Sequence, residues 1–248
     1  MSFLNKVVIV TGASSGIGAA TSILFAKEGA KVAMVGRNEE KLKKVAQKCP
    51  TKPLVIKADI SNDNEVRSLI KDTIDTFGNL DVLVNNAGIG RYASILDENL
   101  MNCYDEIMRT NLRAQVYATH LAVPYLIKSG GNIVNVSSSG GSSLPAIPCI
   151  LSYLISKAGV DHFTRAAALE LAPTGVRVNS VSPGPVRTDM MENSGVKASW
   201  DDAIPLTVLN KVAEPEEIAE LIMYLASEKA KSITGSNYVC DNGAKLKC

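Results

Sequence analysis

The sequence has no excess of either charge and no long hydrophobic run. Its 248 residues include 26 Lys and Arg against 25 Asp and Glu, a formal net charge of +1. Binding to a phosphate backbone needs a basic surface, so we expect no nucleic-acid partner. No apolar stretch approaches the roughly 18 residues of a membrane span, and the first residues lack a signal-peptide layout. We therefore expect a cytoplasmic protein with no membrane partner.

Histidine is scarce, and the cysteines follow no ligand pattern. The two histidines, His120 and His162, are distant in sequence from each other and from any cysteine. The five cysteines are irregularly spaced and include no C-x-x-C pair. Zinc sites need such clusters, so we expect no metal site. The odd cysteine count favours reduced thiols over a disulfide framework.

Short apolar runs alternate with longer amphipathic stretches along almost the whole chain. The runs that predict strands are residues 7–10, 32–35, 54–56, 82–84, 133–136, 176–179 and 238–239. Helical patterns cover residues 17–28, 39–48, 63–77, 100–128, 153–172 and 215–227. Unbroken apolar strands separated by helices are typical of a parallel sheet covered on both faces. We predict one α/β domain over residues 1–248, a doubly wound Rossmann fold with about seven parallel strands.

The stretch 189–212 has no clear period and contains Trp200, the only tryptophan. Long irregular segments within compact domains are often functional. We interpret this stretch as a substrate loop that closes over a pocket, with a plain surface loop as the alternative.

A glycine-rich turn follows the first predicted strand and reads Thr11-Gly12-Ala13-Ser14-Ser15-Gly16-Ile17-Gly18. Gly12 allows a sharp turn, Gly16 lets a pyrophosphate approach the backbone, and Gly18 lets helix and strand pack closely. Amide groups at the start of the next helix then face the anion. A flexible connection without a ligand is the alternative, but the position between strand and helix favours nucleotide binding.

The end of the second strand indicates which dinucleotide binds. An acidic residue there binds the ribose 2′-hydroxyl of NAD. In this sequence Gly36 stands at that place, and Arg37 and Asn38 follow. The guanidinium of Arg37 can pair with a 2′-phosphate, so we predict NADP(H) as the cofactor. The alternative is that Arg37 is a solvated loop charge.

Tyr153 and Lys157 are four residues apart at the start of a predicted helix, which places them on one face. The pKa of a free tyrosine is about 10, and a nearby ammonium group lowers it. We therefore expect Lys157 to lower the pKa of Tyr153 and to activate it for proton transfer. Taken alone, this spacing is more often a surface pair.

Three further motifs follow predicted strands. Asn85-Asn86-Ala87-Gly88 follows the fourth strand, Ser137-Ser138-Ser139 the fifth, and Pro183-Gly184-Pro185-Val186-Arg187-Thr188 the sixth. With the glycine-rich turn and the Tyr–Lys pair, they resemble the short-chain dehydrogenase/reductase family in its short single-domain branch. The resemblance extends from about Lys6 to Gly243 and is nearest to the 3-oxoacyl-carrier-protein reductases and related carbonyl and steroid reductases.

The resemblance implies reversible hydride transfer between NADP(H) and a carbonyl or alcohol group. It implies that Tyr153 protonates the carbonyl oxygen, that Ser138 stabilises this oxygen, and that Lys157 binds the nicotinamide ribose. Ser139 is the alternative to Ser138, because the spacer from serine to tyrosine is longer than we expect for the family. Asn111 matches the family asparagine that holds a water in a proton relay. An asparagine inside a long helical pattern can interrupt the backbone ladder.

The resemblance also implies a set of cofactor-binding residues at the strand ends. They are Thr11, Gly12, Ser14, Ser15, Gly16, Ile17, Gly18, Arg37, Asn38, Asp59, Ile60, Asn86, Ala87, Gly88, Tyr153, Lys157, Pro183, Gly184, Val186 and Thr188.

The residues expected around the substrate are mostly apolar. With Ser138 and Tyr153, they are Tyr92, Leu144, Met190 and Trp200. They favour a hydrophobic ketone or its alcohol, such as a steroid, terpenoid or oxoacyl group, unless several of them belong to the core. Family members commonly form homodimers or homotetramers. The helices at 100–128 and 153–172 are apolar on more than one side, which favours such assembly.

Two other classes of function compete with this interpretation. A non-catalytic NADP(H)-binding sensor or scaffold retains the same fold, because a fold does not imply activity. The complete set of Ser138, Tyr153 and Lys157 argues against it. A methyltransferase also uses a glycine-rich first turn, but an acidic end to the second strand is missing here. We therefore expect an NADP(H)-dependent oxidoreductase.

Overall fold

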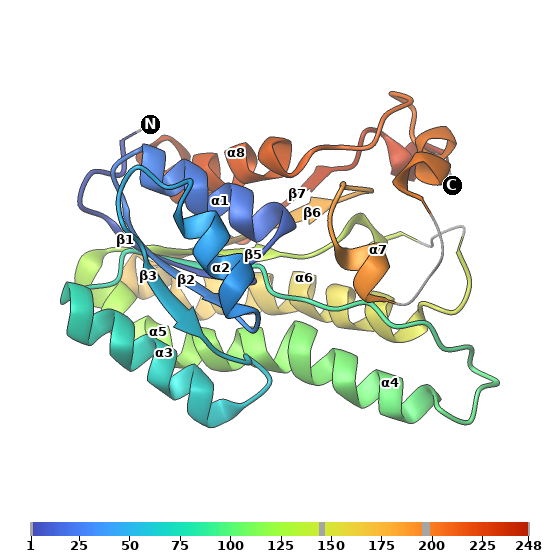
Figure 1. Cartoon of the computed structure of the whole chain (residues 1–248), viewed down its shortest axis with the longest axis horizontal. Coiled ribbons are helices and arrows are strands. Elements are labelled where there is room, and N and C mark those ends of the chain that lie inside the picture. Colours follow the sequence, from blue (N-terminus) through green and yellow to red (C-terminus); the bar gives the residue numbers. More distant parts are fainter. Residues whose placement is uncertain (1, 144–146, 195–198, 248) are drawn as a thin grey trace.

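Seven parallel strands of the described residues form one sheet with helices on both faces (Figure 1). The computed structural model describes residues 2–143, 147–194 and 199–247. The strand order is β3-β2-β1-β4-β5-β6-β7. The strands are β1 (Val7–Thr11), β2 (Lys31–Gly36), β3 (Leu54–Lys57), β4 (Val82–Asn85), β5 (Asn132–Val136), β6 (Arg177–Pro183) and β7 (Asn237–Cys240). The predicted doubly wound Rossmann fold is confirmed.

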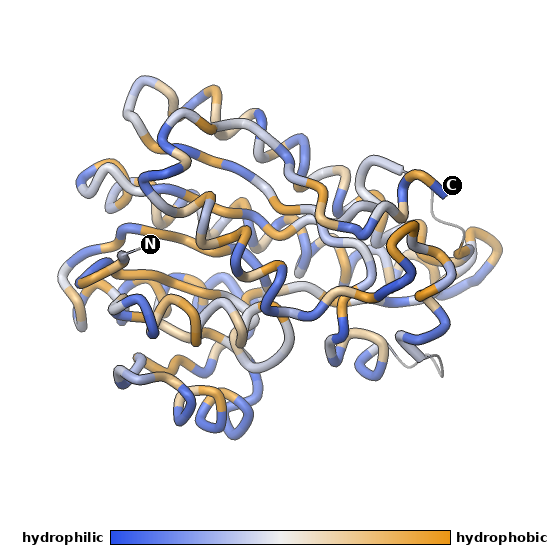
Figure 2. The backbone as a smooth tube through the Cα atoms, turned by 90° about the horizontal axis from the view of Figure 1, so that it is seen from above, coloured by the Kyte–Doolittle hydropathy of each residue, from blue (hydrophilic) through white to orange (hydrophobic). Residues whose placement is uncertain are grey.

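Two apolar clusters hold the helices on the sheet. One cluster joins α1 (Gly16–Lys27), α2 (Glu39–Ala46) and α8 (Pro215–Ala226) to one face. The other joins α3 (Asp63–Phe77), α5 (Ala114–Ser129) and α6 (Leu151–Leu171) to the opposite face. Figure 2 shows hydrophobic and hydrophilic residues alternating along the helices, as expected when one side of each packs on the sheet. The seven parallel strands all end at the same edge, and that edge positions the site.

The stretch predicted as one helix over 100–128 is helical throughout, but its hydrogen bonding changes in the middle. It consists of α4 (Leu100–Ile107), a π-helical turn (Met108–Arg113) and α5. Asn111 lies within this turn and is fully buried. A π-turn widens the helix locally and is frequent at functional sites.

The predicted irregular stretch 189–212 contains short helices. It includes α7 (Met190–Asn193) and a 3-10 helix (Trp200–Leu206). In Figure 1, α7 is the short orange helix. These helices follow no apolar period, and the 3-10 helix is held by local capping bonds at Ser199.

A ladder of buried amides and hydroxyls crosses the middle of the sheet. Nδ2 of Asn85 donates to Oγ1 of Thr119 at 3.1 Å and to Oδ1 of Asn135 at 2.9 Å. Nδ2 of Asn135 donates to Oγ1 of Thr164 at 2.9 Å. These residues are all buried, so the ladder ties β4 and β5 to α5 and α6 directly beneath the edge that carries the site.

We predict that Asn135→Ala lowers the free energy of unfolding by about 2–3 kcal/mol, because it leaves buried partners on both sides unpaired and opens a cavity. Urea denaturation measures this change. Asn102→Ala is the matched control, because the Asn102 amide makes an exposed bond to Asn99 on the surface of α4. We expect it to change stability by less than about 0.5 kcal/mol. Equal effects of the two variants would contradict a structural role for the ladder.

Candidate active site

One large cleft, of about 760 Å³, follows the carboxyl ends of the strands. Most predicted cofactor-binding residues line it: Gly12, Ser14, Ser15, Gly16, Ile17, Arg37, Asn38, Asp59, Ile60, Asn86, Ala87, Gly88, Tyr153, Lys157, Pro183, Gly184, Val186 and Thr188. Ser138, Met190 and Trp200 line the same cleft. Thr11, Gly18 and Asn111 lie behind its walls, where they shape it from below.

The glycine-rich turn is closed so tightly that side chains do not fit in it. Gly12 has φ +69°, and a Cβ there would lie 2.8 Å from Nδ2 of Asn86. A Cβ on Gly18 would lie 2.2 Å from the carbonyl oxygen of Gly12. The Ser15 side chain makes no capping bond at the start of α1, so the first amide groups of this helix are available to an anion. This cradle fits the pyrophosphate of a dinucleotide.

Thr11 joins the turn to the next strand end. Its buried Oγ1 accepts from the backbone N–H of Asn86 at 3.0 Å and of Ala87 at 3.1 Å. Nδ2 of Asn86 donates back to the carbonyl oxygen of Thr11 at 2.8 Å. Thr11 therefore fixes the position of neighbouring cleft residues without reaching the cleft itself.

The end of the cleft beside β2 and β3 contains charges of both signs, because Glu39, Glu40 and Asp59 line it together with three cations. Arg37 is exposed there and makes no hydrogen bond or ion pair within the described part of the chain. Lys41 and Lys57 line the same end, and the sequence argument missed both. Oδ1 of Asn38 accepts from the N–H of Lys41 at 2.9 Å, so Asn38 caps α2. Both lysines lie at or a few residues after the end of a strand in the sequence, and this position was the available signal.

Ser138, Tyr153 and Lys157 line one wall of the cleft. Ser138 follows β5, and the other two lie in the first turns of α6, which begins two residues earlier than predicted. Nζ of Lys157 donates to the carbonyl oxygen of Val136 at 2.9 Å and lies 5.7 Å from the centre of the Tyr153 ring. Ser139 is absent from the cleft lining and begins a short 3-10 turn instead.

The pKa of Tyr153 shifts in the direction opposite to the one expected from its proximity to Lys157. Burial raises the pKa of Tyr153, and a hydrogen bond with Ser138 offsets only part of that rise. Burial also lowers the pKa of Lys157 to about 8, against an opposing effect of Asp161. Desolvation is the largest cause of both pKa shifts, and it favours the neutral form of each group. Tyr153 therefore holds its proton at neutral pH.

Asn111 uses its side chain to hold the backbone beside the cleft. Its Oδ1 accepts from the N–H of Ile89 at 2.8 Å, and its Nδ2 donates to the Ile89 carbonyl oxygen at 2.9 Å and to Oγ of Ser156 at 3.3 Å. A Cβ on Gly88 would lie 3.4 Å from Oδ1 of Asn111 and 3.6 Å from Nζ of Lys157. Asn111 and Lys157 thus approach the same glycine.

Only some of the residues predicted to contact substrate line the cleft. Met190 and Trp200 line the cleft, whereas Tyr92 is 39% exposed and is absent from the lining. In its ionised form, Tyr92 raises the pKa of Tyr153. Leu144 lies outside the described residues.

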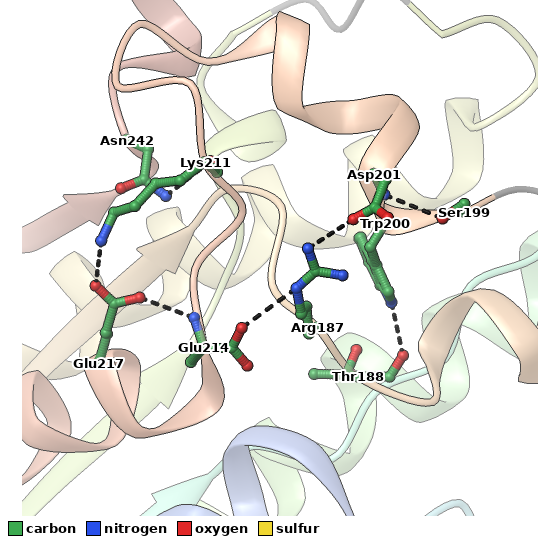
Figure 3. A network of polar contacts seen from close by, with 9 residues as sticks. All are labelled: Arg187, Thr188, Ser199, Trp200, Asp201, Lys211, Glu214, Glu217 and Asn242. Carbon is green, nitrogen blue, oxygen red and sulfur yellow. Dashed lines mark hydrogen bonds and ion pairs between the residues drawn. The ribbon is translucent and has the colours of Figure 1, made fainter.

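A polar network fixes the segment that carries Trp200 (Figure 3). Nε1 of Trp200 donates to the carbonyl oxygen of Thr188 at 2.9 Å. Arg187 pairs with Asp201 at 2.6 Å and with Glu214 at 3.2 Å. The network joins two stretches on either side of α7 and holds the indole against the cleft.

The sequence argument also assigned no role to Ser137, which lines the cleft, or to Asp161, which does not. Oγ of Ser137 donates to the carbonyl oxygen of Lys157 at 3.0 Å. Asp161 is 4% exposed and lies one turn after Lys157 on α6. Burial raises the pKa of Asp161. The i, i+4 spacing from Lys157 was the available signal, because it places this carboxylate on the same helix face.

Within the described residues, no cluster of metal-binding side chains occurs. No helix of that part of the chain is long and apolar enough to cross a membrane.

Comparisons with known proteins show the family. A family model described as enoyl-(acyl carrier protein) reductase matches residues 12–245. A solved short-chain dehydrogenase from Burkholderia cenocepacia, in complex with NADP, superposes with a TM-score of 0.91 and is 31% identical, covering 98% of this chain and 99% of that one. The chain belongs to the short-chain dehydrogenase/reductase family. This confirms the resemblance on which the site assignment rests.

Other short-chain dehydrogenases/reductases differ in substrate and cofactor. The 3-oxoacyl-(acyl-carrier-protein) reductase of Thermotoga maritima is 38% identical, covering 96% of this chain and 97% of the relative. Cyclohexanol dehydrogenase from an Acinetobacter strain is 35% identical, with coverage of 99% and 97%. A Brucella melitensis 3-ketoacyl-(acyl-carrier-protein) reductase complexed with NADH has a TM-score of 0.88 and 32% identity, with coverage of 98% and 100%.

The family assignment determines the class of reaction. The protein is an oxidoreductase that acts on CH–OH and C=O groups with a nicotinamide cofactor. The cradle at the start of α1 and the wall of Ser138, Tyr153 and Lys157 lie in the same cleft, as this class requires.

We predict that Lys157→Met raises the free energy of unfolding at pH 7 by about 1–2 kcal/mol. The variant removes a buried charge, and the loss of one hydrogen bond offsets part of that gain. Between pH 8 and the ordinary lysine pKa of 10.5, the unfolded chain holds this proton and the folded chain does not. Wild-type stability therefore rises with pH relative to the variant, and the difference narrows.

Urea midpoints of both proteins from pH 7 to 10 measure this effect. Lys48→Met is the control, because Lys48 is exposed and its removal leaves the pH dependence unchanged. A constant difference across this pH range would contradict the lowered pKa of Lys157.

Proposed function

We propose that this protein catalyses the NADPH-dependent reduction of a hydrophobic ketone or aldehyde, in a reaction that also runs in reverse. The observation that carries this proposal is the wall of Ser138, Tyr153 and Lys157 in a cleft that also contains the glycine cradle and the unpaired Arg37. Tyr153 is protonated at neutral pH, which is the form that can give a proton to a carbonyl oxygen.

Ser138, Tyr153 and Lys157 have different roles in the proposed proton transfer. Bound NADPH supplies the hydride to the carbonyl carbon. Tyr153 gives its hydroxyl proton to the carbonyl oxygen, and the Ser138 hydroxyl donates a hydrogen bond to the charge that develops there. Lys157 places a cation beside Tyr153, which stabilises the phenolate left after the transfer. In the reverse direction, the phenolate of Tyr153 accepts the alcohol proton.

The preference for NADP(H) rests on the end of β2. Gly36 carries no carboxylate that would repel a 2′-phosphate, and the guanidinium of Arg37 is free to pair with one. Lys57 adds a second cation at the same end of the cleft. One solved relative is in complex with NADP and another with NADH, so the fold alone does not fix the cofactor and the proposal rests on these local residues.

The substrate side of the cleft favours an apolar molecule. Ile89, Met190 and Trp200 line it, and we propose the stretch 189–212 as the substrate loop. An oxoacyl, terpenoid or steroid carbonyl has this character. We also propose a homodimer or homotetramer, because Met101 of α4, Val116 of α5 and Ile155 of α6 are exposed.

We predict that Tyr153→Phe lowers kcat by at least about 100-fold, because the general acid is lost, while the Kd for NADPH stays nearly unchanged. Turnover of a panel of apolar ketones, followed by NADPH absorbance, measures the effect. Tyr224→Phe is the control, since this tyrosine is exposed on α8. Wild-type turnover by Tyr153→Phe would contradict the proposed acid, and an absence of wild-type turnover in either direction would contradict the proposed reaction.

We predict that Arg37→Leu raises the Kd for NADPH by about 10- to 100-fold, the equivalent of losing one charge-assisted pair, and leaves the Kd for NADH within about 2-fold. Titrations that follow nicotinamide fluorescence give both constants. Lys44→Leu removes an exposed cation from α2 outside the cleft and serves as the control. Tighter binding of NADH than of NADPH by the wild type would refute the role of Arg37.

A further inference from the structure

An ion pair crosses the cleft between two elements that are distant in sequence. Nζ of Lys41, on α2, lies 2.5 Å from Oδ2 of Asp189, which immediately precedes α7. Both residues line the cleft. Their side chains are 47% and 32% exposed, so the pair is partly open to water. It connects the end of the cleft beside β2 and β3 to the first residue of the proposed substrate loop.

The other end of α7 is attached to the opposite side of the site. Nη1 of Arg91 donates to the carbonyl oxygen of Asn193 at 3.3 Å. Arg91 is itself fixed by two hydrogen bonds, of 2.9 and 2.7 Å, to the carboxylate of Glu106 on α4. Between these attachments, Met190 and Asn193 line the cleft. The segment Asp189–Asn193, called the strap below, therefore lines the cleft with an anchor at each end.

The remaining polar contacts of this region do not join the strap to α2. The network in Figure 3 connects Arg187 and Thr188 to the chain after residue 198, so it fixes the base of the substrate loop. Among the ion pairs of the described residues, the Lys41–Asp189 pair is the one that joins α2 to the strap. Opening of the strap at this end requires that pair to break.

Asp189 places a negative charge in the cleft, where we propose that an anionic cofactor binds. A carboxylate in a cleft that receives a pyrophosphate repels the ligand unless a cation neutralises it. Lys41 provides that cation and at the same time ties the strap down. An exposed pair is also weak enough to break and reform quickly, as a closure over an exchanging cofactor needs.

We propose that Lys41 and Asp189 form a latch that holds the strap over the bound nicotinamide cofactor and slows its release. The latch rests on the cofactor occupying this cleft, and it acts whether NADPH or NADH is bound. Lys41 and Asp189 are positioning residues, because they act on the cofactor through the strap.

Stopped-flow release of NADPH, chased with excess NADP⁺ from the preformed complex of the full chain, tests the latch. Lys41→Met and Asp189→Asn each speed release by about 3-fold, the size expected for an exposed ion pair. The double variant releases no faster than either single variant, and the exchanged pair Lys41→Asp with Asp189→Lys restores slow release. Added salt speeds release from the wild type more than from the single variants.

The Asp189→Asn variant separates the latch from simple electrostatics. Without a latch, removal of a negative charge near the pyrophosphate slows release, whereas the latch requires faster release. Lys43→Met and Glu192→Gln are matched controls, because these exposed residues lie on α2 and on the strap outside the pair. We expect both to release NADPH at the wild-type rate.

Slower or unchanged release from Asp189→Asn, or additive effects in the double variant, would overturn the latch. If the wild type binds NADH and not NADPH, the proposed cofactor preference fails, and the same release experiment with NADH still decides the latch. If neither cofactor binds, both proposals fail.

Discussion

The hydroxyl of Thr11 and the amide of Asn86 join the ends of β1 and β4, and the whole cleft is built around that joint. The helix that follows β1 comes so close to the turn that only glycine fits at position 18. A Cβ added to Gly18 would lie 2.2 Å from a backbone carbonyl oxygen. This contact aims the start of α1 at the cleft and sets where an anion can bind. The other strand ends then deliver their residues to the same edge, because all seven strands are parallel.

Burial sets the direction of the pKa shifts on the cleft wall formed by Ser138, Tyr153 and Lys157. The ammonium group of Lys157 is buried and Tyr153 is half-buried, and desolvation shifts the pKa of each toward its neutral form. The surrounding ladder of Asn85, Asn135 and their hydroxyl partners compensates with fully paired polar groups. The site therefore places ionisable groups that are costly to bury beside a hydrogen-bonded polar ladder. Active sites commonly lower the stability of a protein in this way.

Much of the fold was predictable from the sequence, because periodicity and glycine placement are local signals. The strand positions, the glycine-rich turn and the joint placement of Tyr153 and Lys157 depend on residues that are close in the chain. Contacts between distant residues leave no such signal. The Lys41–Asp189 pair joins positions 148 residues apart, and the partners of Asn111 depend on a π-turn that no apolar period reveals. The sign of the pKa change at Tyr153 was mispredicted because it depends on burial.

Trp200 is the only tryptophan of the chain, and its indole N–H is bonded to the backbone at Thr188 beside the cofactor cleft. The ultraviolet emission of the whole protein therefore comes mainly from one point of its active cleft. Indole emission shifts with the polarity of its surroundings and with the loss of its hydrogen bond. The molecule thus contains an intrinsic optical label, at a place where an added dye would disturb the cleft.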